Sequence, residues 1–260
     1  MKILVTGHKG FIGSQIFSNL KSNGFDVTGI DLDDKLVDAK YDYIVHMGAR
    51  TLIRNSREKP FEYFRDNMVL SLQMLEISRK YGSVIIYPTS GSVSEATNPY
   101  SLAKKQIVEW IELYRNLYGI RRHVLKFYNI YGPTSRKGAV YLFCNAALND
   151  LPAIIYGDGS HIRDFIHVED VVRTIRMIID GKIPEGHHEV GTGRGTSVMQ
   201  LLHMVEEQTG KKLSVKYEDY ILSEADRLVA GNPIINDPIP LERGINEVLK
   251  ELKKEKSGVA

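Results

Sequence analysis

Short apolar runs alternate with longer amphipathic segments over the first 130 residues. The apolar runs are rich in β-branched residues and predict strands at 2–6, 26–31, 41–49, 83–88 and 123–129. The segments between them carry apolar residues three or four positions apart and predict helices at 12–24, 60–80 and 100–118. Strands and helices that alternate at this spacing are typical of an α/β fold with a parallel, doubly wound sheet.

Beyond residue 130 the elements are spaced less regularly. The pattern predicts helices at 138–150, 168–180, 197–209 and 241–254, and strands at 153–157, 187–191 and 213–217. We expect the charged tail from residue 250 onward to fray. The change in rhythm predicts a first domain of 1–130, to which 165–191 returns, and a smaller C-terminal lobe of 131–164 and 192–260.

Composition and charge narrow the classes of partner. The formal net charge of +2 requires neither a nucleic acid nor a membrane surface as partner, and no apolar run reaches the length that spans a membrane. Cys144 is the only cysteine, which excludes an internal disulfide and makes a zinc–thiolate site implausible, so we expect a buried core thiol. The N-terminus lacks the pattern of a signal peptide, and we expect a cytoplasmic protein.

A glycine-rich turn follows the first predicted strand. The stretch VTGHKGFIG places Gly7, Gly10 and Gly13 where a tight turn, a close approach to a pyrophosphate and helix packing need them. Asp31, at the end of the second strand, can accept hydrogen bonds from the adenosine ribose and repels a 2′-phosphate. The turn therefore predicts a dinucleotide site that prefers NAD to NADP, although Lys9 in the same loop would weaken this preference.

A set of motifs extends this pattern along the chain. They are HMGA (46–49), PFEYFRDNMVLSLQMLE (60–76), PYSLAKKQIVE (99–109), KFYNIYGP (126–133), YGDGSHIRDFIHVEDV (156–171) and EVGTGRGTSVMQLL (189–202). In this order, and together with the glycine spacing, they resemble the extended short-chain dehydrogenase/reductase family. Within it they are most similar to the nucleotide-sugar branch, which contains proteins like UDP-glucose 4-epimerase. Lys126 stands where that family usually has an arginine.

The resemblance implies a Rossmann-type NAD-binding domain and a nucleotide-sugar-binding lobe. The implied cofactor-binding residues are Gly7, Gly10, Phe11, Ile12, Gly13, Asp31, Leu32, Met47, Gly48, Ala49, Asn67, Thr89, Tyr100, Lys104, Tyr128 and Ile130. The implied substrate-binding residues are Ser90, Ser92, Asn129, Val140, Tyr156 and Arg163. No metal ligand is implied, and a homodimer through helices 60–80 and 100–118 is expected by resemblance alone.

Tyr100 and Lys104 carry the expected chemistry. Oxidation of a sugar hydroxyl by NAD needs a base, and a free tyrosine is a poor one at neutral pH because its pKa is about 10. Four residues on a helix place the two side chains on one face, where the Lys104 ammonium would stabilise a phenolate. By the family's spacing Ser90 donates a second hydrogen bond to the substrate oxygen, and Thr89 is its neighbour.

Gly91 and Ser92 also reduce the number of reactions that the resemblance leaves open. Dehydratases of the family need an acidic pair where Gly91 and Ser92 stand here, so dehydration is disfavoured. The favoured function is an NAD-dependent 4-epimerase, which oxidises C4 of a nucleoside-diphosphate hexose and reduces the ketone from its other face. A 4-keto-sugar reductase is the alternative, and an NAD-binding sensor without turnover is a remote one.

Two spacings depart from the family pattern. Fourteen residues separate Asp31 from His46, too few for the usual third strand and its helix, and we predict that this unit is absent. Ser90 and Tyr100 are ten positions apart, where epimerases have a longer substrate loop, and we expect a less selective sugar pocket.

Overall fold

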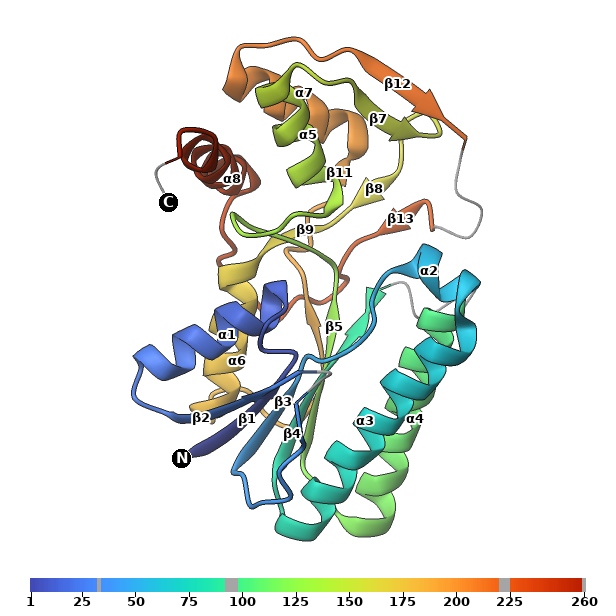
Figure 1. The fold of residues 1–260 in the computed structure, drawn as a ribbon, viewed down its shortest axis with the longest axis vertical. Coiled ribbons are helices and arrows are strands. Elements are labelled where there is room, and N and C mark those ends of the chain that lie inside the picture. Colours follow the sequence, from blue (N-terminus) through green and yellow to red (C-terminus); the bar gives the residue numbers. More distant parts are fainter. Residues whose placement is uncertain (32–33, 92–97, 220–224, 259–260) are drawn as a thin grey trace. The chain divides into compact units, whose positions relative to one another are not determined.

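The computed structural model describes residues 1–31, 34–91, 98–219 and 225–258 (Figure 1). They form two compact units. Unit 1 comprises Met1–Phe127 and Val172–Glu189, and unit 2 comprises Tyr128–Val171 and Val190–Ala260. Of the expected site residues, Leu32 and Ser92 lie outside the described residues. No helix in the described ranges is long and apolar enough to cross a membrane.

Unit 1 is built on a six-stranded sheet with the order β10-β5-β4-β3-β1-β2. The strands are β1 (Lys2–Thr6), β2 (Asp26–Ile30), β3 (Tyr43–His46), β4 (Val84–Ser90), β5 (Arg122–Phe127) and β10 (Gly186–Val190). The pairs from β2 through β5 are parallel. The doubly wound α/β prediction is confirmed.

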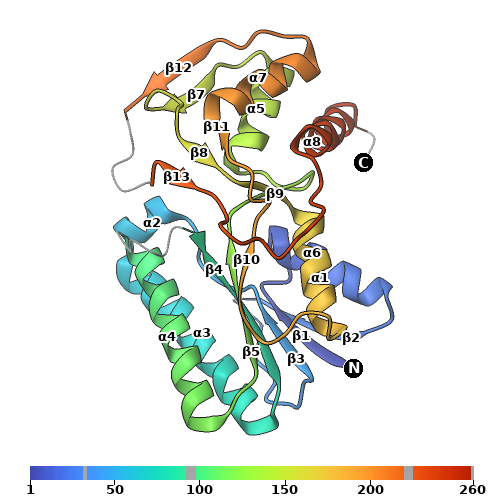
Figure 2. The ribbon, with the colours of Figure 1, turned by 180° about the vertical axis from the view of Figure 1, so that it is seen from behind.

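Helices cover both faces of this sheet. They are α1 (Phe11–Ser22), α2 (Ile53–Glu58), α3 (Pro60–Tyr81), α4 (Pro99–Tyr118) and α6 (Val168–Ile179), whose first turn belongs to unit 2. In two opposite views α3 and α4 lie side by side on one face, and α1 and α6 lie on the other (Figure 1, Figure 2). The central strands β1, β3 and β4 are almost continuously buried, which explains their largely apolar sequence.

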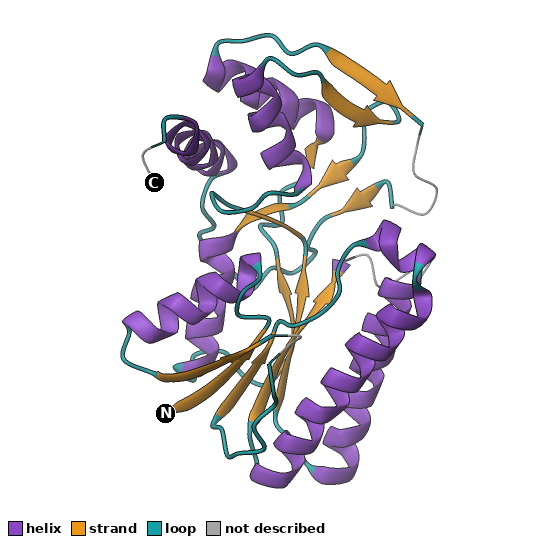
Figure 3. Cartoon of the chain, viewed as in Figure 1, coloured by secondary structure: helices purple, strands orange, loops and turns teal. Residues whose placement is uncertain are grey.

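The expected absence of a third strand and helix is confirmed for the described residues. Residues 31 and 34–42, between β2 and β3, form no helix or strand there, and β2 is the edge of the sheet (Figure 3). The chain passes directly from β2 to β3, which pairs on the far side of β1.

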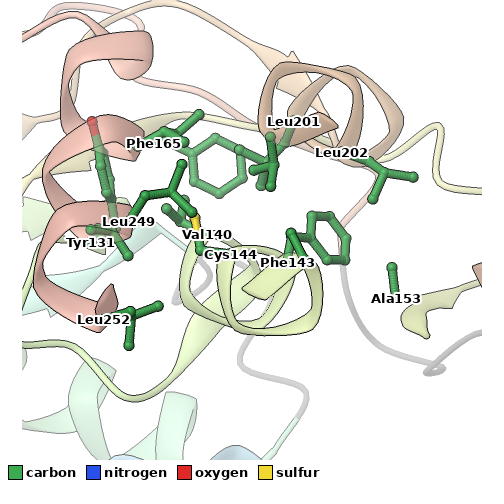
Figure 4. Close-up of a cluster of buried hydrophobic side chains, with 14 of the residues drawn as sticks. Tyr131, Val140, Phe143, Cys144, Ala153, Phe165, Leu201, Leu202, Leu249 and Leu252 are labelled. Atoms are coloured by element: carbon green, nitrogen blue, oxygen red, sulfur yellow. The ribbon is translucent and has the colours of Figure 1, made fainter. Parts of the chain in front are cut away.

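Unit 2 packs three helices around an apolar cluster. The helices are α5 (Gly138–Asn149), α7 (Val198–Thr209) and α8 (Leu241–Lys256). Strand pairs are short: β6 (Asn129–Tyr131) with β9 (Phe165–His167), β7 (Ala153–Tyr156) with β12 (Val215–Glu218), and β8 (Ile162–Arg163) between β11 (Thr196–Ser197) and β13 (Arg227–Leu228). Cys144 is fully buried within the cluster (Figure 4), and burial raises the pKa of its thiol to about 12. The core-thiol prediction is confirmed.

Some expected elements were wrong. The tail does not fray at residue 250, because α8 continues to Lys256, buries Leu252 and donates a hydrogen bond from Lys256 Nζ to the Leu148 carbonyl. The strand expected at 123–129 is two strands, since β5 ends at Phe127 in unit 1 and β6 belongs to unit 2. The helix α2 and the strands β8, β9, β11 and β13 were not anticipated.

One buried carboxylate joins three segments of unit 2. Asp164 is fully buried and accepts hydrogen bonds from the Thr192 amide and hydroxyl and from the Gly193 amide, at 2.6–3.0 Å. It also accepts from the Ala230 amide at 3.2 Å. A carboxylate with several donors is well stabilised inside a protein. Asp164 therefore fixes the glycine-rich turn after β10 and the segment after β13.

We expect Asp164→Asn to destabilise unit 2 by about 3–5 kcal/mol, because an amide would turn one donor toward buried donors. Cys144 reports the opening of this unit, so its labelling by a thiol reagent should accelerate by about 100-fold or more. Asp226→Asn, at an exposed carboxylate, is the matched control. Equal labelling rates in wild type and Asp164→Asn would contradict this account.

Candidate active site

The turn between β1 and α1 leaves no room for a side chain at Gly7 or Gly13. Gly7 has φ +68°, and a Cβ built on it would lie 2.8 Å from Gly48 Cα. A Cβ on Gly13 would collide with the Gly7 carbonyl oxygen. The Gly7 amide donates to the Ile30 carbonyl at 2.8 Å, which ties the turn to the end of β2. The result is a backbone cradle at the edge where the parallel strands end.

The beginning of α1 is suited to an anion. Gly10 is the N-cap, no side chain caps it, and the first turn, with Phe11, Ile12 and Gly13, carries no acidic residue. Backbone N–H groups at such an end attract negative charge. Asp31 follows β2 directly, and its carboxylate accepts a hydrogen bond from the Lys9 amide at 3.1 Å. The structure thus brings Asp31 to the glycine turn.

A buried hydrogen-bond chain runs from the residues after β3 into α3. The Gly48 amide donates to Thr6 Oγ1 at 2.8 Å, and Thr6 Oγ1 is 2.7 Å from His46 Nδ1. His46 Nε2 is 2.9 Å from Ser71 Oγ, which donates to the Asn67 carbonyl. This order of donors assigns a neutral His46 with its proton on Nε2. Burial first, and the nearby Lys104 second, lower the pKa of His46 to about 3.

Asn67 extends the chain to the segment after His46. Its side chain accepts from the Arg50 amide at 2.7 Å and donates to the Arg50 carbonyl at 3.1 Å. Met47, Gly48 and Ala49 lie between these two anchors and are half-buried. The backbone of the expected cofactor residues 47–49 is therefore fixed at both ends.

Tyr100 and Lys104 lie one turn apart on α4, whose N-cap Asn98 accepts from the Ser101 amide. Lys104 is only 4% exposed, donates from Nζ to the Pro88 carbonyl at 2.9 Å, and sits 4.4 Å from the centroid of the Tyr87 ring. The lysine is thereby held at the end of β4, beside the two residues that follow Pro88.

Those two residues are Thr89 and Ser90, which end β4. Both are half-buried, and the buried Oγ1 of Thr89 has no hydrogen-bond partner in the described part of the chain. A buried hydroxyl without a partner is costly unless something else satisfies it. β4 and α4 therefore bring Thr89, Ser90 and Lys104 to one place.

The pKa values of the pair depart from the sequence expectation. Burial first, and Tyr63 second, raise the pKa of Tyr100 to about 12. Burial lowers the pKa of Lys104 to about 7. The expected lowering of the tyrosine pKa by Lys104 does not occur in this structure, because the loss of hydration dominates both groups.

The remaining expected residues belong to unit 2. Tyr128, Asn129, Ile130 and Tyr156 are half-buried, and Arg163 is buried, with Nη1 donating to the Ile162 carbonyl at 3.0 Å. Val140 lies inside the apolar cluster, so its side chain packs in the core and only its backbone is left for a ligand.

Most of this chain matches a known protein family. A sequence profile of the NAD dependent epimerase/dehydratase family matches residues 3–191. The chain belongs to this family.

Individual relatives agree with this assignment. A Methanocaldococcus jannaschii protein, provisionally named a UDP-glucose 4-epimerase, is 31% identical in an alignment 261 positions long, which covers 83% of this chain and 85% of that protein. The UDP-glucose 4-epimerase of Corynebacterium glutamicum is 25% identical and covers 89% and 88%. The solved UDP-glucose 4-epimerase of Thermotoga maritima, in complex with UDP-glucose, superposes with a TM-score of 0.87 at 26% identity, covering 98% of this chain and all of that one.

As a member of the NAD dependent epimerase/dehydratase family, this chain is an enzyme with NAD as cofactor. The residues present fit that cofactor. The backbone cradle at Gly7 and Gly13 excludes side chains, α1 begins without a side-chain cap, and Asp31 lies beside the turn. These three features suit a diphosphate and a ribose with free hydroxyls.

One titratable cluster in this family member was missed by the sequence reasoning. Ligand atoms of His167, Glu169 and Glu247 lie within 4.8 Å of one another. The Glu169 amide donates to His167 Nδ1, so a neutral His167 carries its proton on Nε2, which lies 3.4 Å from Glu247. In that tautomer the Nε2–H faces the Glu247 carboxylate. His187 and His188 point to different partners, Glu112 and the Pro184 carbonyl.

The hydrogen-bond chain through His46 was also missed. Thr6 and His46 are register partners on the paired strands β1 and β3. The polar residues that end these two predicted strands were the available signal, because neighbouring parallel strands place such residues side by side.

We expect the stability of this enzyme to depend on pH through His46. Its folded pKa is about 3, against an ordinary value of 6.5. Only the unfolded state binds the proton between these values, so stability is full above pH 6.5 and falls as the pH drops toward 3. Linkage gives a loss of about 2 kcal/mol at pH 5.

Urea unfolding of wild type and His46→Gln at pH 7.5 and pH 5 measures this loss. The variant should be less stable at pH 7.5 but lose about 2 kcal/mol less between the two pH values. His203→Gln, at an exposed histidine of α7, should behave as wild type. A His46→Gln variant with the wild-type pH dependence would contradict the assignment of a neutral, buried His46.

Proposed function

We propose that this enzyme is an NAD-dependent nucleotide-sugar 4-epimerase. It oxidises the C4 hydroxyl of a nucleoside-diphosphate hexose to a 4-keto sugar and reduces the ketone from the other face. The observation that carries the proposal is the placement of Lys104, buried and anchored at the end of β4, one turn from Tyr100 and next to Thr89 and Ser90. This arrangement provides a proton acceptor and a hydrogen-bond donor for one sugar hydroxyl.

Each residue has one role in this proposal. Bound NAD supplies a reversible hydride acceptor. Tyr100 removes the proton from the C4 hydroxyl and returns it to the reduced oxygen. Ser90 donates a hydrogen bond to the same oxygen, and Lys104 in its charged form stabilises the Tyr100 phenolate. The glycine turn and Asp31 would hold the cofactor, so the hydride stays in the site until it returns to C4, and Tyr100 returns the proton to the same oxygen.

Unit 1 would bind NAD, and unit 2 would recognise the nucleoside diphosphate. Arg163 supplies a planar group suited to a phosphate, Asn129 an amide, and Tyr156 an aromatic face for a base. The relatives' names favour a UDP-sugar as the first substrate to test.

The residues at the end of β4 and on α4 bear on the other candidate functions. The family includes dehydratases, which need an acid at the end of β4, and Gly91 offers no side chain there. A one-way 4-keto-sugar reductase would use the same Ser90, Tyr100 and Lys104, so it remains the second candidate. A sensor that binds NAD without turnover has no use for the buried Lys104.

We expect Tyr100→Phe to lower kcat by about 100-fold or more, because it removes the proton acceptor but leaves the ring. The assay is interconversion of C4-epimeric UDP-, GDP- and dTDP-sugars. Tyr118→Phe, an exposed tyrosine on the same helix, is the control and should retain wild-type kcat. Full activity in Tyr100→Phe would contradict the mechanism.

The same panel separates the candidate functions. Interconversion of two epimers without net change in NADH absorbance supports the 4-epimerase. Net consumption of NADH with a 4-keto sugar favours the reductase. Binding of NAD with no conversion of any sugar favours the sensor.

We also propose that the enzyme is a homodimer through α3 and α4. Large apolar side chains are exposed along both helices, which pack on each other. They are Phe61, Phe64 and Val69 on α3, and Leu102, Trp110, Leu113 and Leu117 on α4. Contiguous exposed apolar surface of this kind marks interaction sites, and a second copy presents the same surface.

We expect the double variant Phe61→Glu/Leu117→Glu to be monomeric, because it places charges on the apolar face. Light scattering after size-exclusion chromatography measures the mass. Leu142→Glu, an equally exposed leucine on α5, should leave the dimer intact. A monomeric wild type would contradict the proposal.

A further inference from the structure

Asp34 is hydrogen-bonded to Asp31, the residue that follows β2. The Asp34 amide donates to the Asp31 carbonyl at 3.0 Å, and the Asp34 side chain accepts from the Asp31 amide at 2.8 Å. Residues 34–42 form no helix or strand in the structure, so no third strand draws Asp34 away from the turn. The shortened connection to β3 therefore leaves a second carboxylate beside Asp31.

This second carboxylate is paired with the lysine of the glycine turn. Lys9 Nζ lies 3.3 and 3.5 Å from the two Asp34 oxygens, and the Lys9 amide donates to Asp31. Lys9, Asp31 and Asp34 thus form a closed ring of contacts between the glycine turn and the end of β2. The hydrogen bond from the Asp31 amide and then the Lys9 side chain lower the pKa of Asp34, which stays ionised at neutral pH.

The ring sets the charge where the adenosine ribose is expected. Two carboxylates and one ammonium give a net charge of −1, whereas Lys9 and Asp31 alone would be neutral. A 2′-phosphate carries up to two negative charges, so it meets repulsion from both carboxylates, while the one cation of the ring is already paired with Asp34. A free ribose hydroxyl pays no such penalty. Lys9 has a long, flexible stem and is largely exposed, so it could reach an anion if Asp34 did not hold it.

We propose that Asp34 is a second specificity-determining residue for the cofactor: it neutralises Lys9 and so prevents the glycine turn from accepting NADP. The proposal rests on the cofactor site at the glycine turn and extends it, since Asp31 alone would leave the turn with a cation able to bind a 2′-phosphate. It depends on both Lys9 and the short connection after β2.

The test measures cofactor binding rather than turnover. NADH and NADPH are titrated into the purified full chain, and binding is followed by the fluorescence of the reduced nicotinamide at low ionic strength. Asp34→Asn keeps an oxygen that accepts from the Asp31 amide, so the turn is preserved while the charge is removed. We expect NADPH to bind about tenfold more tightly to Asp34→Asn than to wild type, with little change for NADH.

Two further variants test whether the freed Lys9 ammonium causes the gain in NADPH affinity. Lys9→Met/Asp34→Asn should lose most of the gain in NADPH affinity, because the gain requires the freed ammonium. Asp38→Asn removes the same charge from an exposed carboxylate that pairs with Lys80, and its ratio of NADPH to NADH affinity should match wild type. The gain should also shrink in 0.5 M salt, since an exposed ion pair is screened.

The outcomes separate this inference from the site on which it rests. An unchanged affinity ratio in Asp34→Asn, with NADH still bound, overturns the role of Asp34 and leaves the cofactor site intact. A gain that persists in Lys9→Met/Asp34→Asn, or appears equally in Asp38→Asn, also overturns it. Failure of wild type to bind either nucleotide would overturn both the cofactor site and the inference.

Discussion

The hydrogen-bond chain from Gly48 through Thr6, His46 and Ser71 to Asn67 is the interaction on which the cofactor end of unit 1 depends. It joins β1, the segment after β3, and α3 through buried polar groups, each of which needs a hydrogen-bond partner. Gly48 can then approach Gly7 closely enough that neither tolerates a Cβ. The shape of the glycine turn is therefore set by a histidine two strands away in the sequence as much as by the glycines themselves.

Sequence reasoning succeeded where a feature is local. The alternation of strands and helices, the glycine turn after β1 and the placement of Tyr100 and Lys104 one turn apart on a helix each depend on neighbours a few residues apart, and the parallel sheet follows from the alternation. Asp164 shows why other features were missed. Its donors come from Thr192, Gly193 and Ala230, which no periodicity connects to it. The strands of two or three residues in unit 2 have the same origin, since tertiary pairing and not propensity forms them.

The described residues between β2 and β3 form no strand or helix, and this changes more than the edge of the sheet. Asp34 accepts a hydrogen bond from the Asp31 amide and meets Lys9 of the glycine turn. A departure that looks like a loss in the sequence thus adds a charged group next to Asp31. The contact between Asp34 and Lys9 could not be derived from the length of the connection after β2, because it depends on where these two side chains lie.

The opposite pKa shifts of Tyr100 and Lys104 limit what this pair does alone. Burial favours the neutral form of each group, and their pKa values differ by about five. Moving a proton from the phenol to the amine is therefore unfavourable for these two groups alone. An oxidised nicotinamide carries a positive charge, and any such charge close to the phenol would reduce this cost because it stabilises the phenolate. In the proposed mechanism, Tyr100 and Lys104 would therefore accept the sugar proton most readily when the oxidised cofactor lies beside them.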